Sequence, residues 1–199
     1  MGYAKSIETR QKLVKTASKL IRTQGYAATG IQQILQESGV PKGSLYYHFP
    51  AGKSELAAEA VRYSNQFTEG RLKKLIEMAG GSVPAFQAFC DYYIASLETT
   101  DFQKGCPIAT ITLEAAATVD LIQAACEDGF AMIERVFIEQ LVSEGVLPKE
   151  AQGQAMMAVT AVEGALILCR ARRNSEPLKV VRGRIAQDMR DAIARGNNG

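Results

Sequence analysis

The chain has 199 residues, of which 47% are apolar and 22% are charged, close to the average for a soluble globular protein. This length suits one compact domain or two small ones, and no apolar run approaches the ~20 residues that span a bilayer. The first residues lack the apolar stretch of a signal peptide, so we expect a cytoplasmic protein without a membrane partner. The four cysteines are widely spaced and form no C-x-x-C pair, so we expect buried thiols, no metal site and no cofactor.

The charge is distributed unevenly along the chain. Residues 1–63 carry nine Lys and Arg against four Asp and Glu, whereas residues 64–199 carry fourteen against seventeen. The net charge of +2 therefore combines a basic front end with a slightly acidic remainder. This asymmetry indicates that the front end binds an anionic partner such as DNA.

Apolar residues recur at three- and four-residue steps along most of the chain, and strand alternation is nearly absent, so the predicted fold is all-α. A first helix is expected to end at Gly25. Thr29 then opens a second helix in a capping-box pattern, with its hydroxyl on the amide of Gln32. Gly39 supplies a tight turn, and Pro41 suits the start of a short third helix. After the first helix, further helices are predicted over about 31–38, 41–49, 54–78, 83–98, 107–117, 119–143, 149–173 and 178–194, which gives about nine in total.

The segment 31–49 has the spacing of a helix-turn-helix, a DNA-binding motif whose second helix enters the major groove. On a helical wheel, Leu45 and Phe49 share the inward side of that second helix, whereas Tyr47 lies opposite. Gly43 lets the backbone approach the bases, and Tyr47 offers a ring to a thymine methyl group and a hydroxyl to a phosphate. The predicted DNA contacts are Thr29, Lys42, Gly43, Ser44, Tyr46, Tyr47, His48 and Lys53. We therefore divide the chain into a DNA-binding domain over 1–53 and a C-terminal domain over 54–199.

Each of these residues also has an ordinary structural explanation. Two tyrosines on a short helix are more often half-buried packing residues, and a single histidine is more often a surface group. Their joint arrangement on one outward face, beside a basic helix, favours DNA.

The stretch TGIQQILQESGVPKGSLYYHF, followed by KSEL, resembles the DNA-binding signature of the tetracycline-repressor (TetR/AcrR) family over about residues 6–60. The resemblance implies a homodimeric transcription factor, usually a repressor, whose C-terminal helices bind a small molecule and release the DNA. It places base contacts on Lys42, Gly43 and Tyr47, and phosphate contacts on the other five residues named above. The long turn PAGK and an early C-terminal PIA segment are similar to the lincomycin-resistance repressor subgroup, whereas Pro41 stands where many family members have serine.

Two apolar stripes at helical spacing, within 83–98 and 130–141, can form either ordinary core or the walls of an apolar cavity, and the family resemblance favours a cavity. The candidate ligand-binding residues are Phe86, Phe89, Tyr93, Ile108, Ile111, Phe130, Ile133, Phe137, Met157 and Glu163. Glu163 stands out as a carboxylate in an apolar helix, so it must be paired, hydrogen-bonded or protonated if it is buried. An arginine of the RARR run at 170–173 is one possible partner, and a bound ligand is another.

The segment 155–169 is apolar nearly all round and rich in small residues, which requires burial on several sides. The last helix, about 178–194, has a single apolar face. These two helices either close the core of one chain or form a four-helix interface between two chains. The candidate dimer-interface residues are Ala158, Ala161, Ala165, Val181, Ile185 and Met189.

The leading hypothesis is a homodimeric, ligand-responsive repressor that leaves a near-palindromic operator on double-stranded DNA when a small apolar effector binds its C-terminal domain. A DNA-binding activator or a partner-regulated factor would use the same DNA-facing residues and stays open. A helical ligand carrier or an enzyme with an inert helix-turn-helix is a third alternative. We expect no catalytic residues, because the single histidine lies on the predicted DNA face and no Gly-rich phosphate loop follows a strand.

Overall fold

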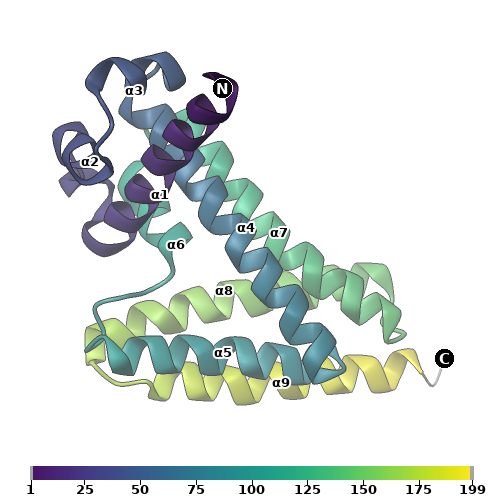
Figure 1. The fold of residues 1–199 in the computed structure, drawn as a ribbon. Coiled ribbons are helices and arrows are strands. Elements are labelled where there is room, and N and C mark those ends of the chain that lie inside the picture. Colours follow the sequence, from purple (N-terminus) through teal and green to yellow (C-terminus); the bar gives the residue numbers. More distant parts are fainter. Residues whose placement is uncertain (1, 198–199) are drawn as a thin grey trace. The chain divides into compact units, whose positions relative to one another are not determined.

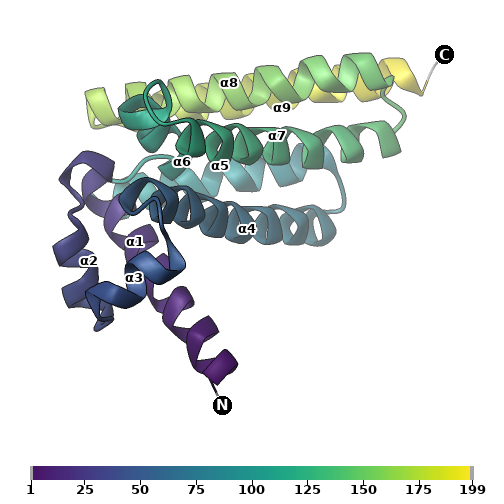
Figure 2. The same cartoon turned by 90° about the horizontal axis from the view of Figure 1, so that it is seen from above.

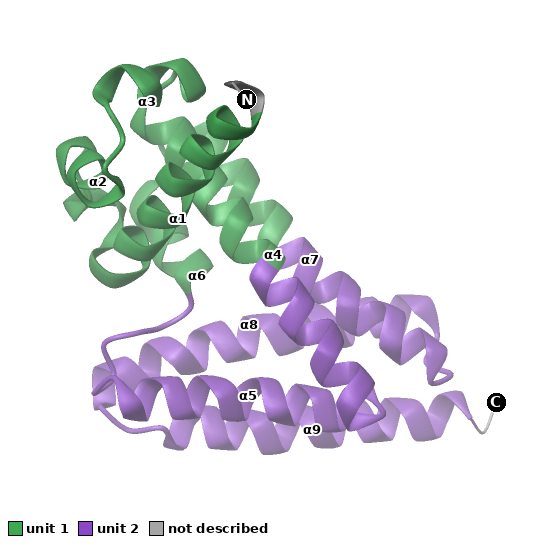
Figure 3. Cartoon of the chain, viewed as in Figure 1, with its two compact units in different colours: residues 1–66, 107–129 green, residues 67–106, 130–199 purple. Residues whose placement is uncertain are grey.

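The computed structural model describes residues 2–197, with side chains from residue 4 onward, and divides into two compact units (Figures 1 and 3). Within this range the protein has nine α-helices, one π-helical turn and no β-strand, which confirms the all-α prediction. The elements are α1 (Gly2–Ala28), α2 (Ile31–Ser38), α3 (Lys42–His48), α4 (Lys53–Ala79), α5 (Ser82–Thr99), α6 (Pro107–Ile111), η1 (Thr112–Ala116), α7 (Asp120–Ser143), α8 (Pro148–Arg172) and α9 (Glu176–Gly196).

The two units do not follow chain order. Unit 1 comprises the residues up to 66 together with 107–129, and unit 2 comprises 67–106 together with the residues from 130 onward. Helices α4 and α7 each begin in unit 1 and end in unit 2. The predicted division between residues 53 and 54 separates functions, whereas the two compact units divide the chain at other positions. The functional division therefore stays a prediction.

Unit 1 is built around α1, which packs against α2, α3, α6 and η1. Leu13 and Ala17 of α1 are completely buried, as the helical spacing of apolar residues predicts. The helix expected over 107–117 is an α-helix that continues as the π-helical turn η1. Such wider turns are often found at functional sites.

A kink in α1 determines where α2 begins. Gly25 has φ 84° and ψ 169°, a backbone region that is essentially restricted to glycine. Glu114 of η1 lies against this kink, and its Oε2 accepts a hydrogen bond of 3.0 Å from the backbone amide of Ala27. A Cβ atom on residue 25 would lie 2.9 Å from the same oxygen, so the site requires glycine for its conformation and for the space it leaves.

The capping box predicted at the start of α2 is wrong. The N-cap of this helix is Gly30, without a side-chain hydrogen bond. The hydroxyl of Thr29 is buried and instead donates a hydrogen bond of 2.6 Å to the carbonyl of Gly25. This bond ties the end of α1 to the start of α2 and leaves the Thr29 hydroxyl unavailable to the amide of Gln32.

In unit 2, helices α5, α8 and α9 run side by side (Figures 1 and 2) and pack on one another. Glu144, just after α7, holds the start of α5, because its carboxylate accepts hydrogen bonds from the amide of Ser82 at 2.6 Å and from the hydroxyl of Ser82 at 2.5 Å. All four cysteines of the chain are buried thiols that form no disulfide among the described residues, and their burial was predicted. Burial raises the pKa of Cys90 to about 12, so its reactive thiolate form is scarce at neutral pH.

The residues predicted at a dimer interface lie mostly inside unit 2. Ala158, Ala165, Ile185 and Met189 are buried within their own chain, and Ala161 and Val181 are only partly exposed. The reason is that the side of α8 that carries these alanines is used for packing within unit 2. The opposite side, which we call the α8 outer face, consists of Gly153, Met156, Met157, Thr160, Gly164, Ile167, Leu168 and Ala171, all of which are exposed.

Helix α8 is also apolar enough, by length and a mean hydropathy of 1.3, to cross a membrane, and the sequence expectation that no segment reaches this limit is wrong. Only 33% of its apolar window is buried in the single chain. This property rests on length and composition alone, and the core helix of a soluble protein passes the same test.

The Gly25 kink can be tested by stability measurements. Gly25→Ala should lower the free energy of unfolding by about 1–3 kcal/mol, because alanine is strained in this conformation and its Cβ would displace the Glu114 carboxylate. Gly70→Ala, at an open position inside α4, is the matched control and should raise stability by up to ~1 kcal/mol. Urea denaturation followed by circular dichroism measures both changes, and a harmless Gly25→Ala would contradict the role given to the kink.

Candidate nucleic-acid interface and effector pocket

The inner side of α3 is held by two apolar side chains. Leu45 and Phe49 are both completely buried in unit 1, where α3 packs against α1. The guanidinium of Arg10 lies 5.2 Å from the centre of the Phe49 ring and forms an ion pair with Glu59 of α4. These contacts fix the rotation of α3 about its own axis, and with it the set of side chains that faces outward.

The outer side of α3 presents aromatic, basic and backbone groups. Tyr47 is 76% exposed and Tyr46 is 43% exposed, while Lys42 and Gly43 are exposed as well. No atom outside the local helix backbone lies within 4 Å of where a Cβ at Gly43 would be, so another molecule can approach the backbone closely there. The Tyr47 ring makes an edge contact with His48, with ring centres 5.0 Å apart. Tyr47 is therefore not a packing residue of unit 1.

The other predicted DNA contacts flank this surface or lie below it. Ser44 and His48 are four residues apart and therefore lie on the same side of α3, where both are partly exposed at one edge of the outward face. Lys53 is partly buried at the first turn of α4, with its Nζ 4.3 Å from the centre of the Tyr26 ring. Burial lowers the pKa of Lys53, and the negative charge of Glu114 opposes this shift. Thr29 is completely buried, so its hydroxyl is not placed to contact a phosphate.

Glu114 and Lys53 connect η1 to the helix-turn-helix, and the sequence analysis did not single out Glu114. The carboxylate of Glu114 contacts the kink at Gly25 and acts electrostatically on Lys53. Nothing in the local sequence marks this residue, because the contact joins positions 87 residues apart. We regard Glu114 as a residue that positions the helix-turn-helix within unit 1.

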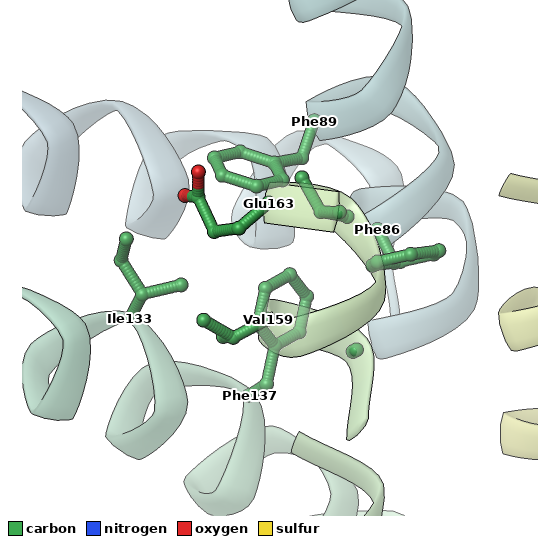
Figure 4. Close-up of a pocket in the computed structure, with 8 residues that line it drawn as sticks. Phe86, Phe89, Ile133, Phe137, Val159 and Glu163 are labelled. Atoms are coloured by element: carbon green, nitrogen blue, oxygen red, sulfur yellow. The ribbon is translucent and has the colours of Figure 1, made fainter. Parts of the chain in front are cut away.

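A small pocket lies in unit 2 between α5, α7 and α8 (Figure 4). Its cavity volume is about 10 Å³, room for about one water molecule and far below the roughly 300–1,000 Å³ that is usual for ligand sites. Its aromatic wall consists of Phe86, Phe89 and Phe137, whose rings meet edge to face at centre distances of 5.9 and 6.2 Å. The complete lining is Phe86, Phe89, Ile133, Phe137, Ala158, Val159, Val162 and Glu163.

The predicted ligand-binding residues separate into those that line this pocket and those that do not. Phe86, Phe89, Ile133, Phe137 and Glu163 line it. Ile108 and Ile111 are instead buried in unit 1, Met157 lies on the α8 outer face, and Phe130 and Tyr93 lie outside the lining. The sequence analysis missed Ala158, Val159 and Val162, although Val159 is four residues before Glu163 and therefore shares its helix face.

Glu163 is the only ionisable residue of the pocket lining. Burial raises its pKa to about 7, and a hydrogen bond with Cys106 partly opposes this shift. The neighbouring phenol of Tyr93 has its pKa raised well above the usual value by burial, and further by Cys106 and by Glu163 itself. Among the described side chains, no group of three His, Cys, Asp or Glu lies close enough to hold a metal ion.

Comparisons with known proteins agree with this geometry. Residues 13–60 match the family "Bacterial regulatory proteins, tetR family", and residues 82–184 match "Transcriptional regulator LmrA/YxaF-like, C-terminal domain". Among curated relatives, the chain is 34% identical to the HTH-type transcriptional regulator YxaF of Bacillus subtilis, over 87% of this chain and 91% of that protein. It is 31% identical to LmrA of the same organism, over 86% of this chain and 91% of the relative.

A solved structure gives the same fold. A TetR transcriptional regulator from Legionella pneumophila superposes with a TM-score of 0.75 at 22% identity, covering 89% of this chain and 95% of the other. The matched family segments and the curated relatives confirm the resemblance seen in the sequence. The protein is therefore a member of the TetR family of transcriptional regulators, with a DNA-binding helix-turn-helix and an LmrA/YxaF-like C-terminal domain.

Proposed function

We propose that this protein is a homodimeric, cytoplasmic repressor that binds a near-palindromic operator and leaves it when a small molecule enters the pocket of unit 2. The observation that carries the proposal is the outward face of α3, where Tyr47 is 76% exposed while Leu45 and Phe49 are completely buried. An exposed tyrosine offers both an apolar ring and a hydroxyl to a partner, and a major groove offers thymine methyl groups and phosphates to it. Lys42 and Gly43 lie beside it at the start of the same helix.

The proposed base contacts are Lys42, Gly43 and Tyr47, and the proposed phosphate contacts are Ser44, Tyr46, His48 and Lys53. Lys53 would have to leave the Tyr26 ring to reach a phosphate, which its flexible side chain allows. We omit Thr29 as a side-chain contact, because its hydroxyl is buried and bonded to the Gly25 carbonyl.

The proposed dimer interface is the α8 outer face. Met156 is 59% exposed and Ile167 is 54% exposed, and the exposed Lys149 lies on the same side of α8 in its first turn, at the end of this face. Gly153 and Gly164 on the same face allow another helix to approach closely. A second copy of the chain would bury this apolar surface symmetrically and would place two α3 helices for two half-sites, about one DNA turn or ~34–36 Å apart.

The proposed release of DNA depends on helices that belong to both units. Helix α4 carries Lys53 at its start in unit 1 and continues into unit 2, and α7 carries the pocket residues Ile133 and Phe137 after beginning in unit 1. A ligand that favours one arrangement of these helices would change the spacing of the two reading helices. Differential affinity of the ligand for the two arrangements is all that this coupling requires.

The groove contacts are tested by substitution. Tyr47→Ala and Lys42→Ala should each weaken operator binding by about 1–3 kcal/mol, that is, about 5- to 150-fold. Lys42→Ala should also make binding less dependent on salt, because a cationic contact to the DNA is lost. Fluorescence anisotropy with a labelled operator duplex measures the affinity at several salt concentrations.

The matched control is Lys74→Ala, which removes an exposed lysine from the part of α4 in unit 2. This variant should bind the operator as the unchanged protein does. Circular dichroism should be the same for all three variants. Full affinity in both Tyr47→Ala and Lys42→Ala would remove the groove assignment.

The dimer face is tested by placing a charge on it. Ile167→Asp should raise the dimer dissociation constant by about 30-fold or more, because an unpaired carboxylate at the centre of an interface costs at least about 2 kcal/mol. The control is Met78→Asp, at a side chain that is 79% exposed near the end of α4. Sedimentation velocity over a range of concentrations distinguishes monomer from dimer. An Ile167→Asp protein that dimerises normally would show that the interface lies elsewhere.

A further inference from the structure

The pocket of unit 2 combines an apolar, aromatic wall with a single carboxyl group. In Figure 4 the carboxylate of Glu163 lies between Phe89 and Ile133, at the edge of the empty space. The other lining residues are apolar. A ligand in this pocket therefore meets one ionisable group and otherwise only hydrocarbon and aromatic surface.

Among the residues that the structure describes, no cationic side chain pairs with this carboxyl group. Among the described residues, the hydrogen-bond partner of Glu163 is the thiol of Cys106, and Tyr93 of α5 lies near it. The part of α7 that faces the pocket contributes only the apolar Ile133 and Phe137. The arginine partner considered from the sequence is not found, since Arg170 packs instead on Gly105, with its Cδ 3.3 Å from the position of a Cβ there.

A buried carboxyl group without a counter-charge is half ionised only near its raised pKa of about 7. Each ionised carboxylate then remains uncompensated in an apolar site, which costs free energy. A ligand that brings a positive charge would remove this cost. Aromatic rings such as those of Phe86, Phe89 and Phe137 attract cations as well, because the face of a ring carries partial negative charge.

We propose that the pocket of unit 2 takes a small organic cation with an apolar or aromatic body, whose charged nitrogen lies at Glu163 and whose body lies against the three phenylalanines. This inference rests on the proposed function in taking the pocket as the effector site. It adds the charge of the effector, which the family match does not give. Because the cavity volume is only about 10 Å³, α5, α7 and α8 have to separate to admit such a ligand.

The test uses benzyltrimethylammonium, which carries one aromatic ring and a charge that does not change with pH. Isothermal titration calorimetry is performed at pH 6 and at pH 8. The ionised fraction of a carboxyl group with a pKa of about 7 rises about tenfold over this interval, so the affinity should rise by up to about tenfold. Tyr93 stays protonated throughout, since its pKa is raised above the usual value of 10.

Glu163→Gln keeps the shape of the side chain and removes the charge. It should bind the cation at least about tenfold more weakly at pH 8 and with no dependence on pH. Glu139→Gln removes one exposed carboxylate from α7 and should behave as the unchanged protein, which controls for net charge.

Benzyl alcohol and benzoate replace the cation with a neutral and an anionic group. Tighter binding of either one, equal binding by Glu163→Gln, or no binding of the cation at pH 8 would overturn the proposal.

The protonation of Glu163 has a second readout that needs no ligand. The pKa of Glu163 is about 7 in the folded protein and near its ordinary value of 4.5 in the unfolded chain, so the unfolded chain releases this proton first as the pH rises. Stability should therefore fall between about pH 4.5 and pH 7 and then level off. Glu163→Gln should lack this component of the pH dependence in urea denaturation. A pH profile that Glu163→Gln leaves unchanged would contradict the raised pKa on which the affinity change depends.

Operator binding by the unchanged protein separates this inference from the proposed function. If the protein binds DNA but not the cation, the charge assignment fails and the regulator stands. If the cation binds at Glu163 but operator affinity is the same with and without it, the ligand class stands and the proposed release mechanism fails.

Discussion

The burial of Leu45 and Phe49 against α1 is the constraint on which the rest of the structure depends. Burying two large apolar side chains contributes about 3–6 kcal/mol, a large share of the stability of a small domain. A rotation of α3 that exposed these two side chains would lose this free energy of burial. Tyr47 must therefore point away from unit 1, and at 76% exposure its ring is accessible to another molecule.

A second constraint, the set of contacts around Gly25, positions the start of the helix-turn-helix. The backbone of Gly25 allows the kink near the end of α1, the hydroxyl of Thr29 ties the start of α2 to this kink, and the carboxylate of Glu114 occupies the space that a side chain at residue 25 would need. Helix α1 is thus connected at its kink to η1, which is distant in sequence and begins where α6 ends. A change in α6 or η1 would reach α1, α2 and Lys53 through direct contacts within unit 1.

The sequence predicted the helices and the outward face of α3 because both follow from local periodicity. It failed where a residue's surroundings come from distant parts of the chain. The hydroxyl of Thr29 matches a capping box, but a closer acceptor appears once Gly25 bends the backbone. An all-round apolar helix such as α8 has no preferred side in the sequence alone, so the periodicity could not show that Ala158 is buried in the pocket lining of its own chain and that Met157 is exposed. Glu163 was recognised because a carboxylate in an apolar helix is visible in the sequence alone.

The central claim is that α3 reads a two-fold-symmetric DNA site. Selection of bound duplexes from a random pool, performed in parallel with the unchanged protein and with Tyr47→Ala, tests it most directly. The account predicts that the unchanged protein enriches an inverted repeat with half-sites about one helical turn apart, and that Tyr47→Ala loses the preference at particular base pairs within each half-site. Enrichment of no sequence, or of the same sequence with the same preference by both proteins, would contradict it.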